Sequence, residues 1–199
     1  MLPAGSKEGI LDKKQKTVDF SRNIIYIIDD MKKKLDYPVY RKFLQVFLKN
    51  LEEGLKGYLL AIVLYGSVAR GSARPESDID LLILYRKGEI DVDEIYSISD
   101  IEAGKSPEYQ RLYKNGIYGE ISPLFITPEE IKRNPLILLD IMEEGIILFE
   151  QGKCFTELLE KMRAETKKLG SRKVNLPDGS WYWELKPSWK PGDLIEVVL

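Results

Sequence analysis

Two pairs of residues in the middle of the sequence are of types that bind metal ions and phosphate. Asp78 and Asp80 are separated by a single residue, and ten residues separate Asp78 from the preceding Gly66-Ser67 pair. On a strand, residues two positions apart point to the same face about 7 Å apart. Two carboxylates there repel each other unless a cation lies between them. Such hard oxygen ligands suit Mg²⁺ bridging the phosphates of a nucleotide, with a solvated strand start or helix-capping acids as the structural alternative.

The Gly66-Ser67 pair predicts a phosphate-binding turn. Glycine lets the backbone turn sharply and approach a ligand closely, and Ser67 stands where a short helix is expected to begin. Backbone N–H groups and a hydroxyl at a helix N-terminus favour phosphate; an ordinary turn is the alternative. Arg70 and Arg74 follow in the same segment. They either neutralise the charge of a triphosphate or are simple surface arginines.

Each pair is joined to an apolar run that predicts a buried strand. Residues 58–65 are continuously apolar and are bounded by glycine, and residues 78–85 form a second run of the same kind. Short continuous apolar runs are typical of strands that are covered on both faces. The first strand would deliver Gly66-Ser67, and the second would carry the two aspartates.

This combination resembles the signature of the polymerase-beta-like nucleotidyltransferases, and the spacing is similar to that of their minimal nucleotidyltransferase branch. The resemblance is firm over residues 58–85 and continues to about residue 150, through Pro128-Glu-Glu-Ile and Gly145-Ile-Ile-Leu-Phe. It implies an ATP-binding or other NTP-binding transferase that moves a nucleoside monophosphate to an acceptor hydroxyl and releases pyrophosphate. It also implies two Mg²⁺ ions that organise an in-line displacement.

The resemblance also assigns roles to single residues. Those that match the family's two metal ligands and its phosphate-binding turn are Asp78, Asp80, Gly66 and Ser67, with Arg70 beside the turn. The family adds a third carboxylate on the next strand, at a position that falls near Ser122 in this sequence. Glu120 lies two residues earlier on the same strand face and has a longer side chain. We therefore predict Glu120 as the third metal ligand and catalytic residue, with a solvent-facing glutamate as the alternative.

Composition excludes several other kinds of site. The 199 residues contain no histidine, which removes Ser-His-Asp and Cys-His catalysis and HExxH metal sites. The single cysteine, Cys154, excludes a disulfide framework and multi-cysteine zinc sites. A net charge of −2 argues against a general nucleic-acid coat. No apolar run reaches roughly 18 residues and no signal peptide is visible, so we expect a cytoplasmic protein without membrane contact.

We expect an α/β fold in which a small mixed sheet is flanked by helices. Three parts are predicted: an N-terminal helical extension (1–35), a nucleotidyltransferase domain (36–150), and a C-terminal helix with an aromatic hairpin tail (151–199). The other expected elements are helices over 17–35, about 38–54, 92–114 with a break at 104–107, 128–144 with a restart at 134, and 155–169, and strands over 117–126 and 146–149.

The tail contains all three tryptophans of the chain. Over 181–186 the residues alternate, which places Trp181, Trp183 and Leu185 on one face, and 193–199 is a second strand candidate. We therefore expect an aromatic strand pair formed by these two segments. Its aromatic face would pack on the domain or across a homodimer, with stacking on nucleobases or RNA less favoured.

Two functions stay open at this point. The leading one is Mg²⁺-dependent nucleotidyl transfer with an NTP as donor. Its acceptor is a small molecule, an RNA end, which is not favoured, or a partner protein; minimal members of the family are often paired with a helical toxin subunit. The rival is a non-catalytic nucleotide-binding or interaction subunit that has lost the third acid. The two functions are discriminated by whether Glu120 supplies the third carboxylate in place of the acid that is missing at Ser122.

Overall fold

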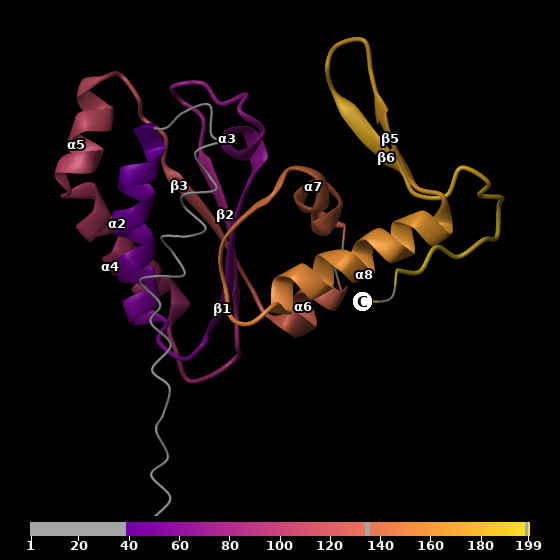
Figure 1. The fold of residues 1–199 in the computed structure, drawn as a ribbon, viewed down its shortest axis with the longest axis horizontal. Coiled ribbons are helices and arrows are strands. Elements are labelled where there is room, and N and C mark those ends of the chain that lie inside the picture. The colour runs from indigo at the N-terminus through magenta and orange to yellow at the C-terminus, as the bar shows by residue number, and fades with distance from the viewer. Residues whose placement is uncertain (1–38, 134–135, 198) are drawn as a thin grey trace, which may run out of the picture.

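The computed structural model describes residues 39–133, 136–197 and 199. The helix expected over 17–35 therefore lies outside the described residues. The described chain is a mixed α/β structure, as the sequence predicts, with one central sheet, helices on both of its faces and a two-stranded hairpin that projects beyond them (Figure 1).

The central sheet has four strands in the order β3-β2-β1-β4. The strand β1 (Leu59–Tyr65) runs antiparallel to both β2 (Ile79–Tyr85) and β4 (Ile146–Glu150), whereas β3 (Ile121–Ile126) runs parallel to β2. These are the four strands expected from the apolar runs. The central position of β1 and β2 explains why their sequences are continuously apolar, because both of their faces are covered.

The helices form a layer on each face of the sheet (Figure 1). One layer consists of α2 (Val39–Gly54), α4 (Val92–Gly104) and α5 (Pro107–Lys114). The opposite layer consists of α6 (Pro128–Arg133), α7 (Ile137–Glu144) and α8 (Cys154–Leu169). A short helix, α3 (Gly66–Arg70), follows β1 directly.

Two hydrophobic cores follow from the alternation of side chains along β1 and β2. Ile62 and Leu81 belong to the core under α2, where Phe47 is completely buried. Ala61 and Leu82 point the other way and belong to the core under α7 and α8, where Phe155 is completely buried. We name the two faces after these helices: the α2 face and the α7 face.

The predicted helix starts are capped by side chains. Asp91 accepts hydrogen bonds from the backbone of Asp93 and Glu94 at the start of α4. Thr127 and Glu130 form the reciprocal pair of a capping box at α6, with distances of 2.8 Å from the Thr127 N–H to Oε2 and 3.3 Å from the Glu130 N–H to Oγ1. Such caps satisfy N–H groups that the helix itself cannot pair.

The aromatic strand pair exists, but its pairing differs from our prediction. β6 (Trp181–Glu184) pairs antiparallel with β5 (Arg172–Asn175), and residues 193–197 lie in no strand. The reason is the tight turn between them, where Gly179 has φ +85° and Asp178 accepts from the Ser180 N–H at 2.9 Å. A turn of this kind joins the strands that flank it directly.

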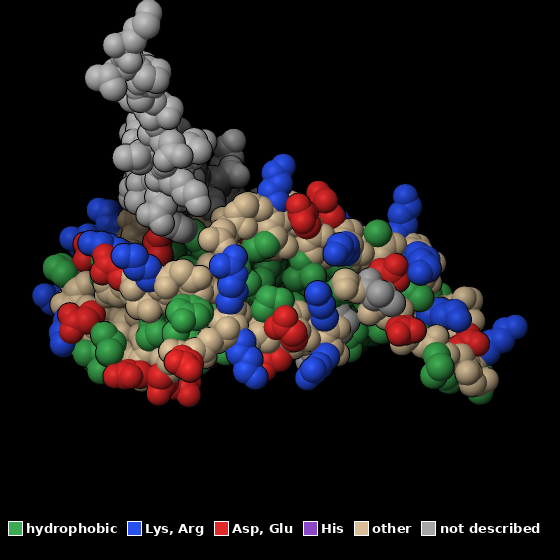
Figure 2. All heavy atoms as spheres, turned by 90° about the horizontal axis from the view of Figure 1, so that it is seen from below, with side chains coloured by type: hydrophobic (Ala, Val, Ile, Leu, Met, Phe, Trp, Pro, Cys, Tyr) green, Lys and Arg blue, Asp and Glu red, His purple; other side chains and the backbone are tan. Residues whose placement is uncertain are grey.

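The surface carries charges of both signs. On the face shown in Figure 2, basic and acidic side chains are interspersed, with hydrophobic side chains between them. This agrees with the near-neutral net charge of −2. In the described part of the chain, no helix combines the length and the apolar character needed to cross a membrane.

Candidate functional site

The pairing of β1 with β2 brings the two predicted motifs to one end of the sheet. Tyr65, the last residue of β1, lies opposite Asp80 in the strand register. Gly66 follows with φ +70°, and a Cβ atom at this position would overlap Oδ2 of Asp80. The Asp80 carboxylate therefore packs directly against the backbone of the Gly66-Ser67 turn. Both the positive φ and this close approach require glycine.

The environment of the Asp80 carboxyl disfavours its charged form. Burial raises the pKa of its carboxyl above the ordinary value, and the neighbouring Asp78 raises it further, while Arg70 acts in the opposite direction. Asp78 is exposed and Asp80 is half-buried. Two carboxylates that repel each other at the mouth of a turn gain stability from a cation that binds both. The predicted pair is thus close enough to interact.

The raised pKa of Asp80 leads to a stability prediction. A carboxyl whose pKa is raised by folding stabilises the folded state fully below its ordinary pKa, and this contribution is lost as the pH rises through the raised pKa. Asp80→Asn cannot ionise. In metal-free buffer at about pH 8 the variant should therefore have a larger free energy of unfolding than the wild type, and the difference should vanish below about pH 4.

Urea unfolding of both proteins at the two pH values, with EDTA present, measures this difference. The control is a variant that also replaces an ionisable carboxyl by an amide, which Asp100→Glu would not do. Asp100→Asn meets this condition, because the pKa of Asp100 is also raised by burial and Asp100 lies next to Glu120. It should show the same sign of effect. An Asp80→Asn variant that is less stable than the wild type at about pH 8 would contradict the electrostatic description of the site.

The pair fits a magnesium ion by the chemistry of its donors. Mg²⁺ takes oxygen ligands, usually one or two carboxylates together with waters and substrate phosphates. Asp78 and Asp80 supply two carboxylates, and the Gly66 turn holds one of them in place. Over the described ranges, no three His, Cys, Asp or Glu side chains gather closely enough to hold one ion. Phosphate and water oxygens would have to complete the coordination shell.

Glu120 does not join this pair. It lines a cavity of about 290 Å³ together with Tyr96 and Asp100 of α4. Burial raises the pKa of both of these groups, and the charge of Glu120 raises it further. That cavity lies on the α2 face, whereas Asp80 follows the buried Ile79 of the α2-face core and points the other way. The prediction that Glu120 is the third carboxylate of the site is not supported by this placement.

The reason lies in where β3 begins. Glu120 precedes the first residue of the strand, so the alternation of side chains that governs the strand does not fix its direction. Its backbone oxygen accepts from the Ile79 N–H at 2.8 Å. Ser122 is the residue that lies opposite Asp80 in the register. The position where an acid is expected from the family pattern therefore holds an exposed serine.

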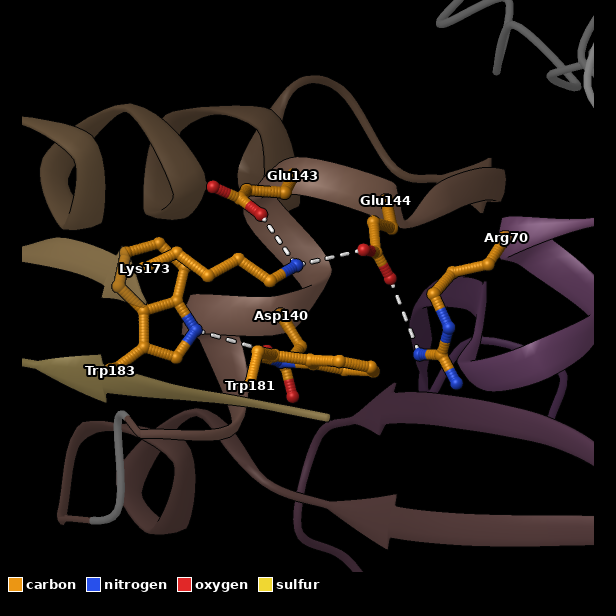
Figure 3. Close-up of polar contacts among 7 residues, drawn as sticks. All are labelled: Arg70, Asp140, Glu143, Glu144, Lys173, Trp181 and Trp183. Atoms are coloured by element: carbon orange, nitrogen blue, oxygen red, sulfur yellow. Dashed lines mark hydrogen bonds and ion pairs between the residues drawn. The ribbon is translucent and has the colours of Figure 1, made fainter. Parts of the chain in front are cut away.

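Arg70, at the end of α3, is held by side chains that the sequence analysis did not connect with the site (Figure 3). Its Nη1 donates to Oε2 of Glu144 at 3.2 Å, and its guanidinium carbon lies 4.9 Å from the ring centroid of Trp181. Lys173 lies over the same ring at 4.6 Å and bonds to Glu144 at 2.9 Å. Arg74, by contrast, is exposed.

The face of the hairpin that carries Trp181 and Trp183 packs on the domain, as one of the alternatives predicted. Both indole N–H groups donate to Oδ1 of Asp140 on α7, at 3.3 and 3.0 Å respectively. Lys173 also bonds to Glu143 at 2.9 Å. The alternating aromatic residues could have indicated a buried hairpin face, but no local signal shows which residues of α7 and α3 it contacts.

Two proteins of Methanocaldococcus jannaschii are similar to this chain in sequence. The protein "Putative protein adenylyltransferase MJ1305" of Methanocaldococcus jannaschii is 28% identical over 167 residues, which is 81% of this chain and 100% of the relative. A second protein of that organism with the same printed function, MJ0604, is 30% identical over 111 residues, 54% of this chain and 96% of its own length.

The solved structures that match part of this chain include toxin–antitoxin complexes. A crystal structure described as a toxin-antitoxin with AMP-PNP matches 62% of this chain and 86% of its own, at 18% identity and a TM-score of 0.38. A second is an AMPylated HEPN toxin in complex with the MNT antitoxin of Shewanella oneidensis, matching 68% of this chain and 89% of its own at 15% identity and a TM-score of 0.35.

The family assignment rests on the match to a family model. The model described as the nucleotidyltransferase domain matches residues 41–176, which include every strand of the central sheet, both motifs and the whole of α8. This range also ends one residue after β5, so it excludes β6 and the tryptophans. The chain belongs to the nucleotidyltransferase domain family and is a nucleotidyltransferase enzyme.

Proposed function

We propose that this nucleotidyltransferase transfers AMP from ATP to a hydroxyl group of an acceptor protein, with Mg²⁺, and releases pyrophosphate. The observation that carries the proposal is the Asp80 carboxylate seated on the Gly66 turn with Asp78 beside it. Both relatives from Methanocaldococcus jannaschii are named as protein adenylyltransferases, which supports adenylyl transfer to a protein. Small molecules and RNA ends are the other acceptor classes, and neither has a specific observation in its favour.

Each residue of the site has a separate task in this proposal. Asp78 and Asp80 would hold a Mg²⁺ ion, which when bound would supply positive charge beside the phosphates. The backbone and hydroxyl of Gly66-Ser67 bind phosphate oxygens, and Arg70 adds a guanidinium that can bind two oxygens at once. Together these groups place the α-phosphorus for attack along the line of the bond that breaks.

At the α-phosphorus the reaction forms one P–O bond and breaks another, and the acceptor hydroxyl loses its proton. The acceptor oxygen bonds to the α-phosphorus as its hydroxyl gives up its proton to water. The bond from the α-phosphorus to the bridging oxygen breaks, and pyrophosphate leaves with that electron pair. The family expectation of two metal ions needs a third carboxylate, which the described residues do not place beside Asp78 and Asp80. The proposal is therefore limited to one ion held by the protein.

The experiment follows AMP into protein. Purified enzyme is incubated with ATP labelled at the α-phosphate, with Mg²⁺, and with an extract of the source cells, then the proteins are separated and released pyrophosphate is measured. We expect one or a few labelled proteins and an equal amount of pyrophosphate. Label and pyrophosphate that depend on the added enzyme should both disappear with EDTA, and ATP labelled at the γ-phosphate should give no labelled protein beyond that of the extract alone.

Two results would contradict the proposal in different ways. Metal-dependent ATP binding without transfer to any protein, small-molecule or RNA fraction would identify the non-catalytic nucleotide-binding subunit. Label that appears in RNA or in a small molecule, and never in protein, would leave the transferase activity but replace the acceptor class. Comparison of ATP with the other three nucleoside triphosphates determines the donor in the same assay.

A further inference from the structure

The C-terminal hairpin contacts the proposed nucleotide site through Trp181. Trp181 contacts Arg70, the last residue of the helix that begins with Gly66-Ser67. Figure 3 shows Trp181 against Asp140 of α7, with Lys173, Glu144 and Arg70 grouped around them. A segment about 110 residues away in sequence thus reaches the residue proposed to bind phosphate. The hairpin therefore contacts a residue of the proposed nucleotide site as well as the hydrophobic core.

Among the described residues, the Arg70 guanidinium uses only one of its nitrogens as a hydrogen-bond donor. Glu144 accepts only from Nη1, at 3.2 Å, and the side chains of this pair are 26% and 22% exposed. A guanidinium has five N–H donors. Within the described ranges, Nε and Nη2 donate to no other residue. Arg70 is also close enough to Asp80 to lower the pKa of its carboxyl, so the unused donors belong to a group beside the metal ligands.

Trp181 itself is fixed before any ligand binds. Its N–H donates to Asp140 at 3.3 Å, and Lys173 lies over its ring at 4.6 Å. Lys173 is in turn tied to α7 by Glu143 and Glu144, both at 2.9 Å. A cation over an indole face is attracted by the ring and keeps its planar fork in a preferred direction. The hairpin and α7 therefore form a rigid support for the Arg70 side chain.

We propose that Trp181, together with Glu144, is a positioning residue that orients the Arg70 guanidinium toward the phosphates of the nucleotide. In this proposal the C-terminal hairpin contributes to nucleotide binding by positioning Arg70. This inference rests on the proposed function, because it assumes that Arg70 binds the triphosphate. It assigns the effect to Arg70 alone, so Trp181 should matter for the triphosphate and not for the nucleoside.

The hairpin offers a matched control in Trp183. Trp183 is on the same strand and the same face, and its N–H donates to the same Asp140 oxygen at 3.0 Å. It packs against the core on the α7 face, and the structure gives it no contact with Arg70 within the described residues. Trp183→Leu therefore loosens the hairpin as Trp181→Leu does, without touching the guanidinium.

The test measures the dissociation constants of Mg·ATP and of adenosine by calorimetry for the full chain and its variants. Trp181→Leu should weaken Mg·ATP about tenfold while adenosine binding stays within about twofold, because a cation–π contact and an oriented guanidinium are lost. Trp181→Phe, which keeps an aromatic ring, should restore most of the affinity. Trp183→Leu should leave the ratio of the two constants unchanged. Trp181→Gln is made alongside, so that the result does not depend on the folding of one variant.

A second measurement separates positioning from a general structural effect. In an Arg70→Ala background, Trp181→Leu should cause no further loss of Mg·ATP affinity, because there is no guanidinium left to orient. Equal losses from the Trp181 and Trp183 variants, or a loss that persists without Arg70, would overturn this inference alone. A wild-type protein that does not bind Mg·ATP at all would overturn the proposed function as well.

Discussion

Replacement of Asp80 by asparagine is expected to remove nucleotidyl transfer almost completely while the fold is kept. The Asp80 carboxylate is the half-buried member of the proposed metal-binding pair and is packed against the Gly66 turn. An amide keeps the shape but loses the charge that opposes the metal ion, and the triphosphate then faces Asp78 without full charge compensation. We expect transfer to fall on the order of 100-fold or more, as for other loss of transition-state charge stabilisation.

The loss can be distinguished from unfolding, because the same variant should be more stable than the wild type in metal-free buffer. Labelled AMP transfer and thermal unfolding are measured on the same samples. Asp100→Asn is the matched control: it also removes a carboxyl whose pKa is raised by burial, but one that lies beside Glu120. Its transfer rate should stay near that of the wild type. Unchanged transfer in Asp80→Asn would rule out the assignment of this residue as a metal ligand.

Gly66→Ala should damage the site through the backbone. Gly66 has φ +70°, and the added methyl group would overlap the Asp80 carboxylate. A residue with a Cβ atom in this left-handed conformation costs about 1–2 kcal/mol, and the carboxylate or the turn must also move. Because metal ligand and phosphate turn are displaced relative to each other, we expect transfer to fall by about two orders of magnitude and the melting temperature to fall as well.

Gly116→Ala separates these two effects. Gly116 has almost the same backbone conformation, φ +74°, and a Cβ atom there would have no atom within 4 Å. It should lower the melting temperature through backbone strain and leave transfer unchanged. The free energy of unfolding and the transfer rate are measured for both glycine variants. Similar transfer rates in the two would mean that the contact between Gly66 and Asp80 has no role in the reaction.

The sequence was sufficient for the parts of the site that are local. The apolar runs before Gly66 and after Asp78 became β1 and β2, and antiparallel pairing of consecutive strands brought the two motifs together. Helix starts were predictable for the same reason, because the Thr127 capping box is completed within four residues. In each case the interaction that decides the structure lies inside a short segment.

Features that the sequence did not indicate depend mainly on interactions between distant segments. Nothing near Trp181 in the sequence indicates that it contacts Arg70, because that contact depends on how α7 carries Glu144 and Asp140 between them. The partner of β6 was decided by the turn at Gly179, which competes with the longer connection to 193–199. Glu120 was assigned by strand alternation, although β3 begins one residue later.

The proline in the edge strand β3 disfavours the addition of a strand from another chain to this edge of the sheet. Within the described residues, β3 pairs only with β2, and the bond from the Ile79 N–H to the Glu120 oxygen fixes which of its residues face that neighbour. Ser122 and Leu124 face β2, so the backbone groups of Pro123 are directed outward. Proline has no N–H, and it is tolerated at this outward position of an edge strand. The outer edge of β3 therefore has a missing donor at its centre and is a poor template for added strands, which protects it from edge-to-edge aggregation. Strand addition at this edge of the sheet is therefore disfavoured.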